Sequence, residues 1–194
     1  MEHNKKMLNI NFKPFPELIT ARLCLRQMTI DDAKDFFAIR SNQTIMARLD
    51  KKVAGSIEEV ILLLKKIECA IESNSGINWA LCLKENNKQI GIVGFHNIYI
   101  ENHRAEIGYT LLPEFHRKGL MKEAVNALIH YGFNQLKFHS IEAKVNPVNQ
   151  ASINLLKGFG FVKEAHFKQN FYFNGDFLDT AIYSLLADSY AKAK

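Results

Sequence analysis

The chain has 194 residues and a hydrophobic fraction of 47%, enough for one globular domain with a substantial core. Its formal net charge is +5, but the basic residues are scattered along the chain, which argues against a nucleic-acid-binding module. No apolar run approaches the ~18 residues of a membrane span, no signal-peptide core is present, and three widely spaced cysteines predict a reduced, cytoplasmic protein without a metal site.

The first part of the chain is expected to form one strand and two helices. Residues 1–18 are polar with two prolines and read as an extended lead-in. Leucines alternate with arginines over 21–28, which predicts a half-buried strand. A helix with two acids in its first turn follows. Ser56 and Glu59 then have the spacing of a capping box, which predicts a long amphipathic helix that ends near Ser73.

The rest of the chain alternates between strands and helices. Three- and four-residue apolar spacing predicts a helix after residue 120 and a shorter one over 149–160. Strands are expected over 77–85, 88–100, 105–113 and 139–145 and in a terminal hairpin that turns at Asn174 and Gly175. Short turns imply antiparallel pairing, and the strand–helix–strand unit implies one parallel crossover. The expected fold is α/β, a mixed, mostly antiparallel sheet of about seven strands with helices on both faces.

The stretch LLPEFHRKGLMKEA, residues 111–124, joins a strand to a helix and has the features of an anion site. Unpaired backbone N–H groups and the helix dipole favour a negative ligand at such a junction. Gly119 allows close approach to the backbone, Arg117 and Lys118 add positive charge, and the first helical residues include no acid. Pro113 removes a hydrogen-bond donor, so the strand must leave its neighbour there. An ordinary strand–helix connection with surface cations would share these features.

Three stretches in order carry a family resemblance: ARLCLRQMTIDDA, AEIGYTLLPEFHRKGLMKEA and NQASINLLKGFGF. The second is similar to the acyl-CoA signature of the GCN5-related N-acetyltransferases: a hydrophobic residue, any residue, proline, two residues, Gln or Arg, two residues, Gly, one residue, then Gly or Ala. The chain looks most like the branch of ribosomal-protein N-terminal alanine and serine acetyltransferases. The resemblance covers residues 19–187, the expected acetyltransferase domain, between an N-terminal extension (1–18) and a C-terminal tail (188–194).

The resemblance implies acetyl-CoA as cosubstrate, in a cleft that opens where strand 105–112 parts from strand 139–145. Pantetheine would pair with the free strand edge, and the backbone N–H of Leu111 would polarise the thioester carbonyl. The resemblance also implies that Asn149 contacts the pantetheine arm and that Ser152 stabilises or protonates the leaving sulfur, although Asn149 could also be a helix N-cap. The expected cofactor-binding residues are Leu111, Leu112, His116, Arg117, Lys118, Gly119, Leu120, Met121, Asn149 and Ser152.

Three positions depart from the family pattern. His116 replaces the usual Gln or Arg, and Met121 replaces a small residue. Backbone N–H groups do most of the pyrophosphate binding, so His116 is expected to be tolerated, and the flexible Met121 side chain can turn aside. Leu156 occupies the position where many members carry a tyrosine general acid, so no tyrosine acid is expected there.

Transfer to an amine requires a proton acceptor, and Glu106 is the candidate base, acting through water. Glu106 could instead be a solvent-exposed carboxylate, and His103 in the preceding turn is a second candidate. Tyr109 is a candidate for the acyl pocket. Trp79 and Phe95 are candidates for the acceptor wall, with packing in the core as the alternative for all three aromatic side chains.

The sequence thus predicts an acetyl-CoA-dependent N-acetyltransferase with direct transfer in a ternary complex. The acceptor is expected to be a primary amine, either a protein N-terminal α-amine or a small-molecule amine, and contact with nucleic acid or membrane is not expected. A CoA-binding regulatory module without turnover is the alternative. An aromatic cluster, Phe171 to Phe173, is interpreted as a substrate lid or as a homodimer contact.

Overall fold

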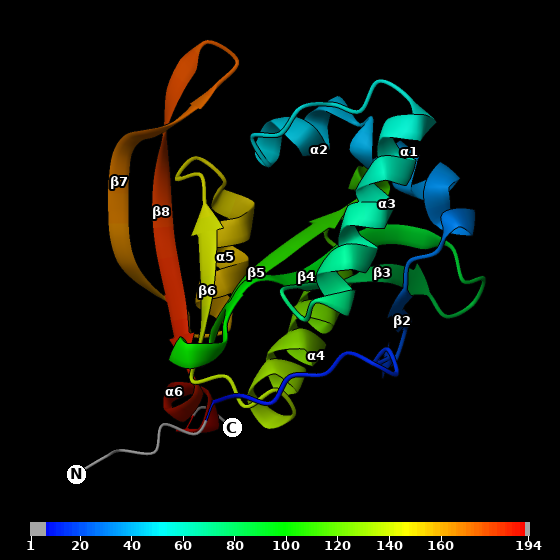
Figure 1. Cartoon of the computed structure of the whole chain (residues 1–194). Coiled ribbons are helices and arrows are strands. Elements are labelled where there is room, and N and C mark those ends of the chain that lie inside the picture. The colour runs from blue at the N-terminus through cyan, green and yellow to red at the C-terminus, as the bar shows by residue number, and fades with distance from the viewer. Residues whose placement is uncertain (1–6, 193–194) are drawn as a thin grey trace.

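A central sheet of eight strands organises the computed structural model, which describes residues 7–192 (Figure 1). The strands, in chain order, are β1 (Leu18–Ile19), β2 (Leu23–Gln27), β3 (Ile77–Leu83), β4 (Gln89–Tyr99), β5 (Arg104–Leu111), β6 (Ser140–Val145), β7 (Val162–Phe173) and β8 (Asp176–Leu186). Their order in the sheet is β1-β2-β3-β4-β5-β6-β8-β7. The strand beyond the expected seven is β1, a two-residue strand that pairs with β2.

Six α-helices and three short 3₁₀ turns connect these strands in the described part of the chain. The helices are α1 (Ala33–Arg40), α2 (Gln43–Arg48), α3 (Ile57–Glu72), α4 (Leu120–Asn134), α5 (Gln150–Gly158) and α6 (Ala187–Lys192). The 3₁₀ turns are η1 (Ile30–Asp32), η2 (Ile100–Asn102) and η3 (Pro113–Phe115). The capping of α3 by Ser56, whose hydroxyl accepts from Glu59 N, is confirmed.

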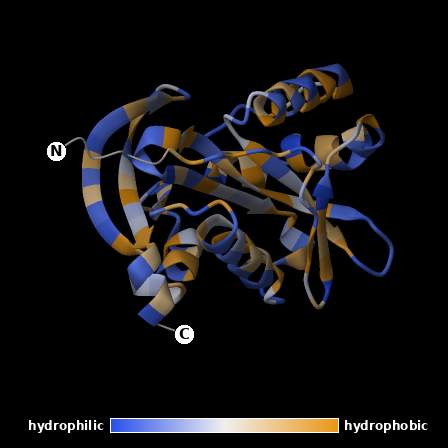
Figure 2. Cartoon of the chain, turned by 60° about the horizontal axis from the view of Figure 1, so that its bottom comes forward, coloured by the Kyte–Doolittle hydropathy of each residue, from blue (hydrophilic) through white to orange (hydrophobic). Residues whose placement is uncertain are grey.

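The pairing of the strands confirms the expected mixed sheet. Neighbouring strands are antiparallel except for β5 and β6, which are parallel. The terminal hairpin turns at Asn174 and Gly175, with φ values of 50° and 95°, and this pair of positive φ angles suits a tight hairpin. In Figure 2 the outer strand of this hairpin, β7, appears at the left as alternating hydrophilic and hydrophobic bands.

The sheet splits between β5 and β6. These two strands pair in register only from Arg104–Ser140 to Glu106–Glu142. β5 then continues to Leu111 and β6 to Val145 without pairing to each other. Figure 1 shows the two strands diverging from their shared end. One edge of β5 is therefore left without a neighbouring strand, as the resemblance implied.

Side chains of β3 and β4 alternate between two layers of helices, as the period of a strand requires. Trp79 and Phe95 belong to the main core, which also includes one face of α4. Ala80 and Cys82 belong to a smaller cluster with α1 and α3. Gly132 lets α4 approach the sheet, because a Cβ there would lie 2.9 Å from Phe95 Cζ.

The segments on both sides of the expected domain also pack against the core. Ile10 and Phe12 are buried in the main cluster, and Phe12 N donates to Asn74 Oδ1 at 3.1 Å. At the other end, α6 places Tyr190 beside Phe133, with ring centroids 5.3 Å apart. Residues 1–6 and 193–194 of the expected extension and tail lie outside the described residues.

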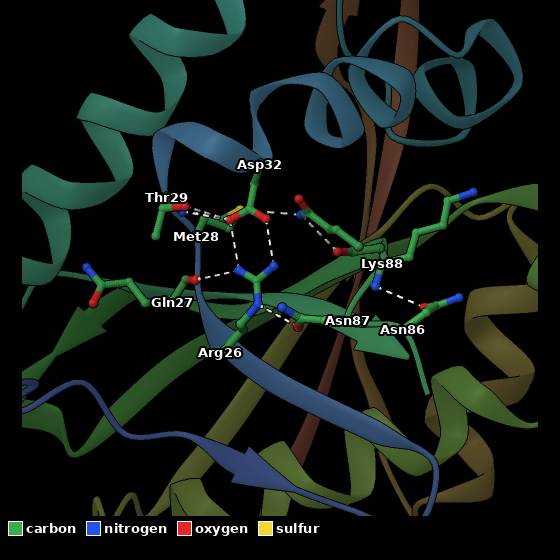
Figure 3. Close-up of polar contacts among 10 residues, drawn as sticks. Arg26, Gln27, Met28, Thr29, Asp32, Asn86, Asn87 and Lys88 are labelled. Atoms are coloured by element: carbon green, nitrogen blue, oxygen red, sulfur yellow. Dashed lines mark hydrogen bonds and ion pairs between the residues drawn. The ribbon is translucent and has the colours of Figure 1, made fainter. Parts of the chain in front are cut away.

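A buried ion pair joins β2 to the start of α1 (Figure 3). Arg26 donates to both oxygens of Asp32, at 2.7 and 2.8 Å, and its Nε donates to Asn87 Oδ1 at 2.9 Å. Asp32 also accepts from Thr29 N at 2.7 Å. Burial raises the pKa of Asp32, but the hydrogen bonds from Arg26 and Thr29 outweigh burial and hold this pKa below its usual value. The helix expected after residue 29 thus begins as the turn η1, fixed by this pair.

Candidate functional site

A cavity of about 640 Å³ lies where β5 and β6 part. Its walls come from α1, the end of α2 and the segment after it, α3, strands β3 to β6, the start of α5 and the terminal hairpin. Five of the residues singled out in the sequence line it together: Glu106, Tyr109, Asn149, Ser152 and Phe171. The structure thus brings the candidate base and the candidate sulfur-side residues into one space.

The open edge of β5 presents the backbone N–H of Leu111. Leu112 N donates to Ile90 O at 2.9 Å, so these two residues are a hydrogen-bonded pair of the β4–β5 ladder. Such pairs alternate, so Leu111, opposite Gly91, directs its N–H and C=O away from β4. His116 Nε2 lies 2.9 Å from the Leu111 carbonyl oxygen. The N–H of Leu111 therefore faces the gap, whereas that of Leu112 is already bonded within the sheet.

The turn before α4 has the backbone shape of an anion cradle. Arg117 and Gly119 have φ values of 60° and 75°. Gly119 is the N-cap of α4 and no side chain caps the helix, so the N–H groups at Leu120 and Met121 remain for a ligand. A Cβ on Gly119 would meet Arg22 Nη2 at 3.5 Å. The cradle fits the pyrophosphate of CoA, and it lies outside the cavity lining.

The first acidic residue of α4, Glu123, is hydrogen-bonded to residues near the start of the chain. Glu123 Oε2 accepts from Arg22 Nε at 2.7 Å, and its Oε1 accepts from Thr20 Oγ1 at 2.6 Å. Arg22 Nη1 also donates to Lys118 O at 2.9 Å. Burial raises the pKa of Glu123, but the hydrogen bonds from Thr20 and Arg22 outweigh burial and lower it. Arg22 thus neutralises Glu123 and holds the turn in place.

Glu106 is an ion-paired carboxylate in the cavity wall, with its side chain 19% exposed. Lys144 Nζ lies 2.9 Å from Oε2, and Asn97 Nδ2 donates to the same oxygen at 3.0 Å. The hydrogen bond to Glu106 raises the pKa of Lys144, against the opposing effect of burial. Both contacts are made by Oε2 of the carboxylate.

A tyrosine hydroxyl lies at the serine that was expected beside the sulfur. Tyr109 Oη is 2.8 Å from Ser152 Oγ, although the two residues are 43 positions apart. Burial raises the pKa of Tyr109 to about 12, with the Ser152 hydrogen bond opposing it, so the phenol is protonated at neutral pH. Leu156 is fully buried in the core. The structure therefore provides a phenol from β5, and not from α5.

Asn149 is the N-cap of α5. Its Oδ1 accepts from Ser152 N at 3.2 Å, and its Nδ2 donates to Arg48 O at 3.4 Å. The capping role considered for it in the sequence is confirmed. The Asn149 side chain also lines the cavity. Its contact with the pantetheine arm is a proposal.

Trp79 and Phe95 do not line the cavity, and their expected place on the acceptor wall is corrected. Both are fully buried; Trp79 Nε1 donates to Pro16 O at 2.6 Å. Both side chains point to the face of the sheet that α4 covers. The adjacent residues Asn78 and His96 point to the opposite face and line the cavity. A shift of one residue changes the face of a strand side chain.

His96 is one of the site residues that sequence reasoning missed. It is opposite Glu106 in the β4–β5 register, and its ring covers Gly108, where a Cβ would lie 2.9 Å from Nε2. Burial and Lys51 lower the pKa of His96, while Glu106 opposes them, so the ring is neutral at neutral pH. The polar pair His96 and Asn97, which interrupts the apolar pattern of the strand, was the available signal. His103 instead lies in a turn, where its C=O accepts from His139 N at 2.6 Å.

Comparisons with known proteins agree with this geometry. The family model described as an acetyltransferase (GNAT) domain matches residues 22–162. The uncharacterized N-acetyltransferase YoaA of Bacillus subtilis is 37% identical over 172 residues, which cover 89% of this chain and 97% of that protein. The solved structure of ribosomal-protein-S5-alanine acetyltransferase from Vibrio fischeri matches with a TM-score of 0.79 and 26% identity, over 90% of this chain and 98% of that one.

A structure with bound ligands is also similar. Spermidine N-acetyltransferase from Vibrio cholerae, in complex with CoA and spermine, matches with a TM-score of 0.79 and 25% identity, over 89% of this chain and 99% of that one. The chain therefore belongs to the GNAT acetyltransferase family. It is an N-acetyltransferase with acetyl-CoA as cosubstrate.

Two further properties bear on the type of site. Within residues 7–192, no group of three or more His, Cys, Asp or Glu side chains is placed to hold a metal ion. No helix in the same range is long and apolar enough to cross a membrane.

Proposed function

We propose that this enzyme transfers the acetyl group directly from acetyl-CoA to a primary amine in a ternary complex, and that a protein N-terminal α-amine is its acceptor. The observation that carries the proposal is the shared cavity, which is lined by Glu106 and Tyr109 of β5 and by Ser152 of α5, the hydrogen-bond partner of Tyr109. Among relatives, a ribosomal-protein alanine acetyltransferase and a spermidine acetyltransferase have the same fold. Both acceptors named there are primary amines.

The cosubstrate is positioned by backbone groups. In this proposal the pantetheine arm lies along the open edge of β5, and the N–H of Leu111 donates to the thioester carbonyl oxygen. The pyrophosphate lies against the turn at Arg117, Lys118 and Gly119 and the first N–H groups of α4. His116 holds the Leu111 carbonyl and so fixes the strand end at which the donor is needed.

The amine nitrogen attacks the thioester carbon, an N–C bond forms, the C–S bond breaks, and the nitrogen gives up one proton. Glu106 accepts this proton through a water molecule, while Lys144 and Asn97 keep the side chain in place. Attack requires a neutral amine, and a positioned carboxylate is one of the groups that act as a general base toward it. The neutral ring of His96 lies on the same wall and is the second acceptor to test.

Substitution Glu106→Gln is expected to lower kcat by about 100-fold or more, the usual contribution of a general base, and to change the pH–rate profile. Glu101→Gln is the matched control, because Glu101 is exposed and does not line the cavity. Steady-state thiol release as a function of pH measures both effects. An unchanged profile in Glu106→Gln would transfer the role to His96, which His96→Asn then tests.

The leaving thiolate is stabilised by a hydrogen-bond chain in this proposal. A free thiol has a pKa of about 8.5, whereas that of Tyr109 is raised to about 12. Full proton transfer from the phenol to the sulfur is therefore uphill by several pKa units. Ser152 donates to the sulfur and Tyr109 to Ser152, and the thiolate takes its proton later from solvent.

Substitution Tyr109→Phe is expected to lower kcat by about 10-fold and to leave the KM for acetyl-CoA unchanged, since Ser152 loses the hydrogen bond that supports its donation to the sulfur. Ser152→Ala should have a similar effect. The double variant should be little worse than either single variant, because both act through one chain. If the losses in kcat multiply in the double variant, the two hydroxyl groups act independently and the chain is wrong.

Turnover itself is tested by thiol release from acetyl-CoA with a panel of amines that includes N-terminal peptides. The proposal expects release that depends on the amine and formation of the N-acetylated product, identified by mass spectrometry. Binding of acetyl-CoA without release on any acceptor would overturn the proposal.

A further inference from the structure

Two cations in the cavity wall lie near each other without an anionic partner. Arg40 ends α1, and Lys51 follows α2; both line the cavity across from β4 and β5. Lys51 is exposed, yet partial desolvation lowers its pKa, and the nearby charge of Arg40 lowers it further while Glu106 opposes both. Neither cation forms an ion pair with any described residue.

The Arg40 guanidinium also lacks a hydrogen-bond acceptor. Its Nε is buried and has no hydrogen-bond partner among the described residues, and desolvation lowers the pKa of the side chain. An unsatisfied buried donor is costly, and an acceptor atom from a ligand would remove that cost. A guanidinium beside an ammonium group is a suitable place for a carboxylate.

The acids of the cavity already have their own partners. Glu106 is bound to Lys144. Asp179 Oδ2 lies 2.6 Å from His166 Nε2, and Asp50 accepts from an asparagine amide, Asn146 Nδ2, at 3.1 Å. The lining holds five cations and three acids. The cations are Arg40, Arg48, Lys51, Lys66 and Lys144. The acids are Asp50, Glu106 and Asp179.

The phosphates of the cosubstrate do not account for these cations. The expected pyrophosphate cradle lies at residues 116–121, and none of those residues lines the cavity. The cavity contains instead the residues of the reacting end, Glu106, Tyr109 and Ser152. A ligand that reaches Arg40 and Lys51 from this space is therefore the acceptor.

We propose that Arg40 and Lys51 form an anion subsite that binds a carboxylate of the acceptor, so that the enzyme prefers the α-amine of peptides with an acidic residue near the N-terminus. The inference rests on the proposed function. A polyamine would place positive charge against the same two cations, which is unfavourable. In this proposal the charges of Arg40 and Lys51 determine which acceptor is preferred, and the catalytic groups do not.

The test compares three peptides of equal length that begin with alanine and differ only in the second and third residues, which are glutamate, glutamine or lysine. Thiol release gives kcat/KM for each, with spermidine and free glutamate as further acceptors. The glutamate peptide is expected to exceed the glutamine peptide by about 10-fold or more, the usual effect of a hydrogen bond to a charged group. Use of free glutamate would also support carboxylate recognition.

Substitutions of Arg40 and Lys51 test whether these two residues cause the preference for the glutamate peptide. Arg40→Gln and Lys51→Gln should each lower kcat/KM for the glutamate peptide by about 10-fold to 100-fold and change the value for the glutamine peptide less than about threefold. Lys52→Gln is the matched control, because Lys52 is exposed and does not line the cavity. Affinity for acetyl-CoA, measured by calorimetry, should be the same in all of them, which excludes unfolding as the cause.

The failure of this inference differs from failure of the proposed function. Equal rates with the three peptides, a preference for spermidine, or equal losses on both peptides in Arg40→Gln would overturn the anion subsite and leave an acetyltransferase. An absence of thiol release with every acceptor would overturn the transfer reaction itself.

Discussion

Substitution Gly119→Asp is expected to lower the affinity for acetyl-CoA by about 100-fold or more, because like charges brought together at a binding site cost several kcal/mol. The new carboxylate would lie at the uncapped start of α4, where the pyrophosphate is proposed to bind. An L-residue at the φ of 75° found there also costs about 1 kcal/mol. Isothermal titration calorimetry with acetyl-CoA measures the loss.

Gly175→Asp is the matched control for this variant. Gly175 also has a positive φ, 95°, and a Cβ there would meet no atom within 4 Å. The Gly175→Asp variant therefore has a similar backbone strain, but in the hairpin turn and not at the start of α4. We expect it to bind acetyl-CoA with the affinity of the unchanged protein. Wild-type affinity in Gly119→Asp would show that the turn before α4 does not hold the pyrophosphate.

Substitution Asp32→Ala is expected to lower the free energy of unfolding by about 3–5 kcal/mol, the usual cost of removing one partner of a buried ion pair. Arg26, with its side chain 18% exposed, would keep its charge without a counter-charge, and Thr29 N would lose its acceptor. Urea denaturation measures the change. Asp31→Ala, at an exposed neighbour, is the control and should change stability by less than about 0.5 kcal/mol.

The same pair predicts a dependence on pH. The folded-state pKa of Asp32 is lowered, so its contribution is fully present above the unfolded value of about 3.9. The contribution is lost as the pH falls through the folded pKa. The stability difference between the unchanged protein and Asp32→Asn should therefore shrink below about pH 4. A difference that stayed constant over this range would mean that the charge of Asp32 does not stabilise the fold.

The sheet could be predicted from the sequence because its signals are local. The Asn174–Gly175 turn, the Ser56 cap and the strand–helix–strand spacing each fix one connection. The helix α2 was missed, since six residues after Asn42 are too few to show a period. The short strand β1 was missed for the same reason, because two residues cannot display alternation.

The site was predictable only in part. The β5 end and the turn before α4 lie in one continuous motif, so their places followed from the sequence. The face of β3 did not, because six of its seven residues are buried and Asn78 is the single polar residue in the strand; Trp79 was therefore assigned to the wrong side. The contact of Tyr109 with Ser152 joins distant parts of the chain, and only the folded sheet brings them together.

The short junction between β5 and β6 has a consequence for the whole molecule. Strands β1 to β5 and strands β6 to β8 meet along a seam of three residue pairs. A cosubstrate that lies along the open edge of β5 would supply hydrogen bonds that a longer β6 would have made. It would thereby stabilise the junction between the two parts of the sheet. By mass action, a ligand present at 100 times its Kd adds about 2.7 kcal/mol to the stability of the state that binds it. In the proposed complex, acetyl-CoA would thus stabilise the sheet as well as donate the acetyl group.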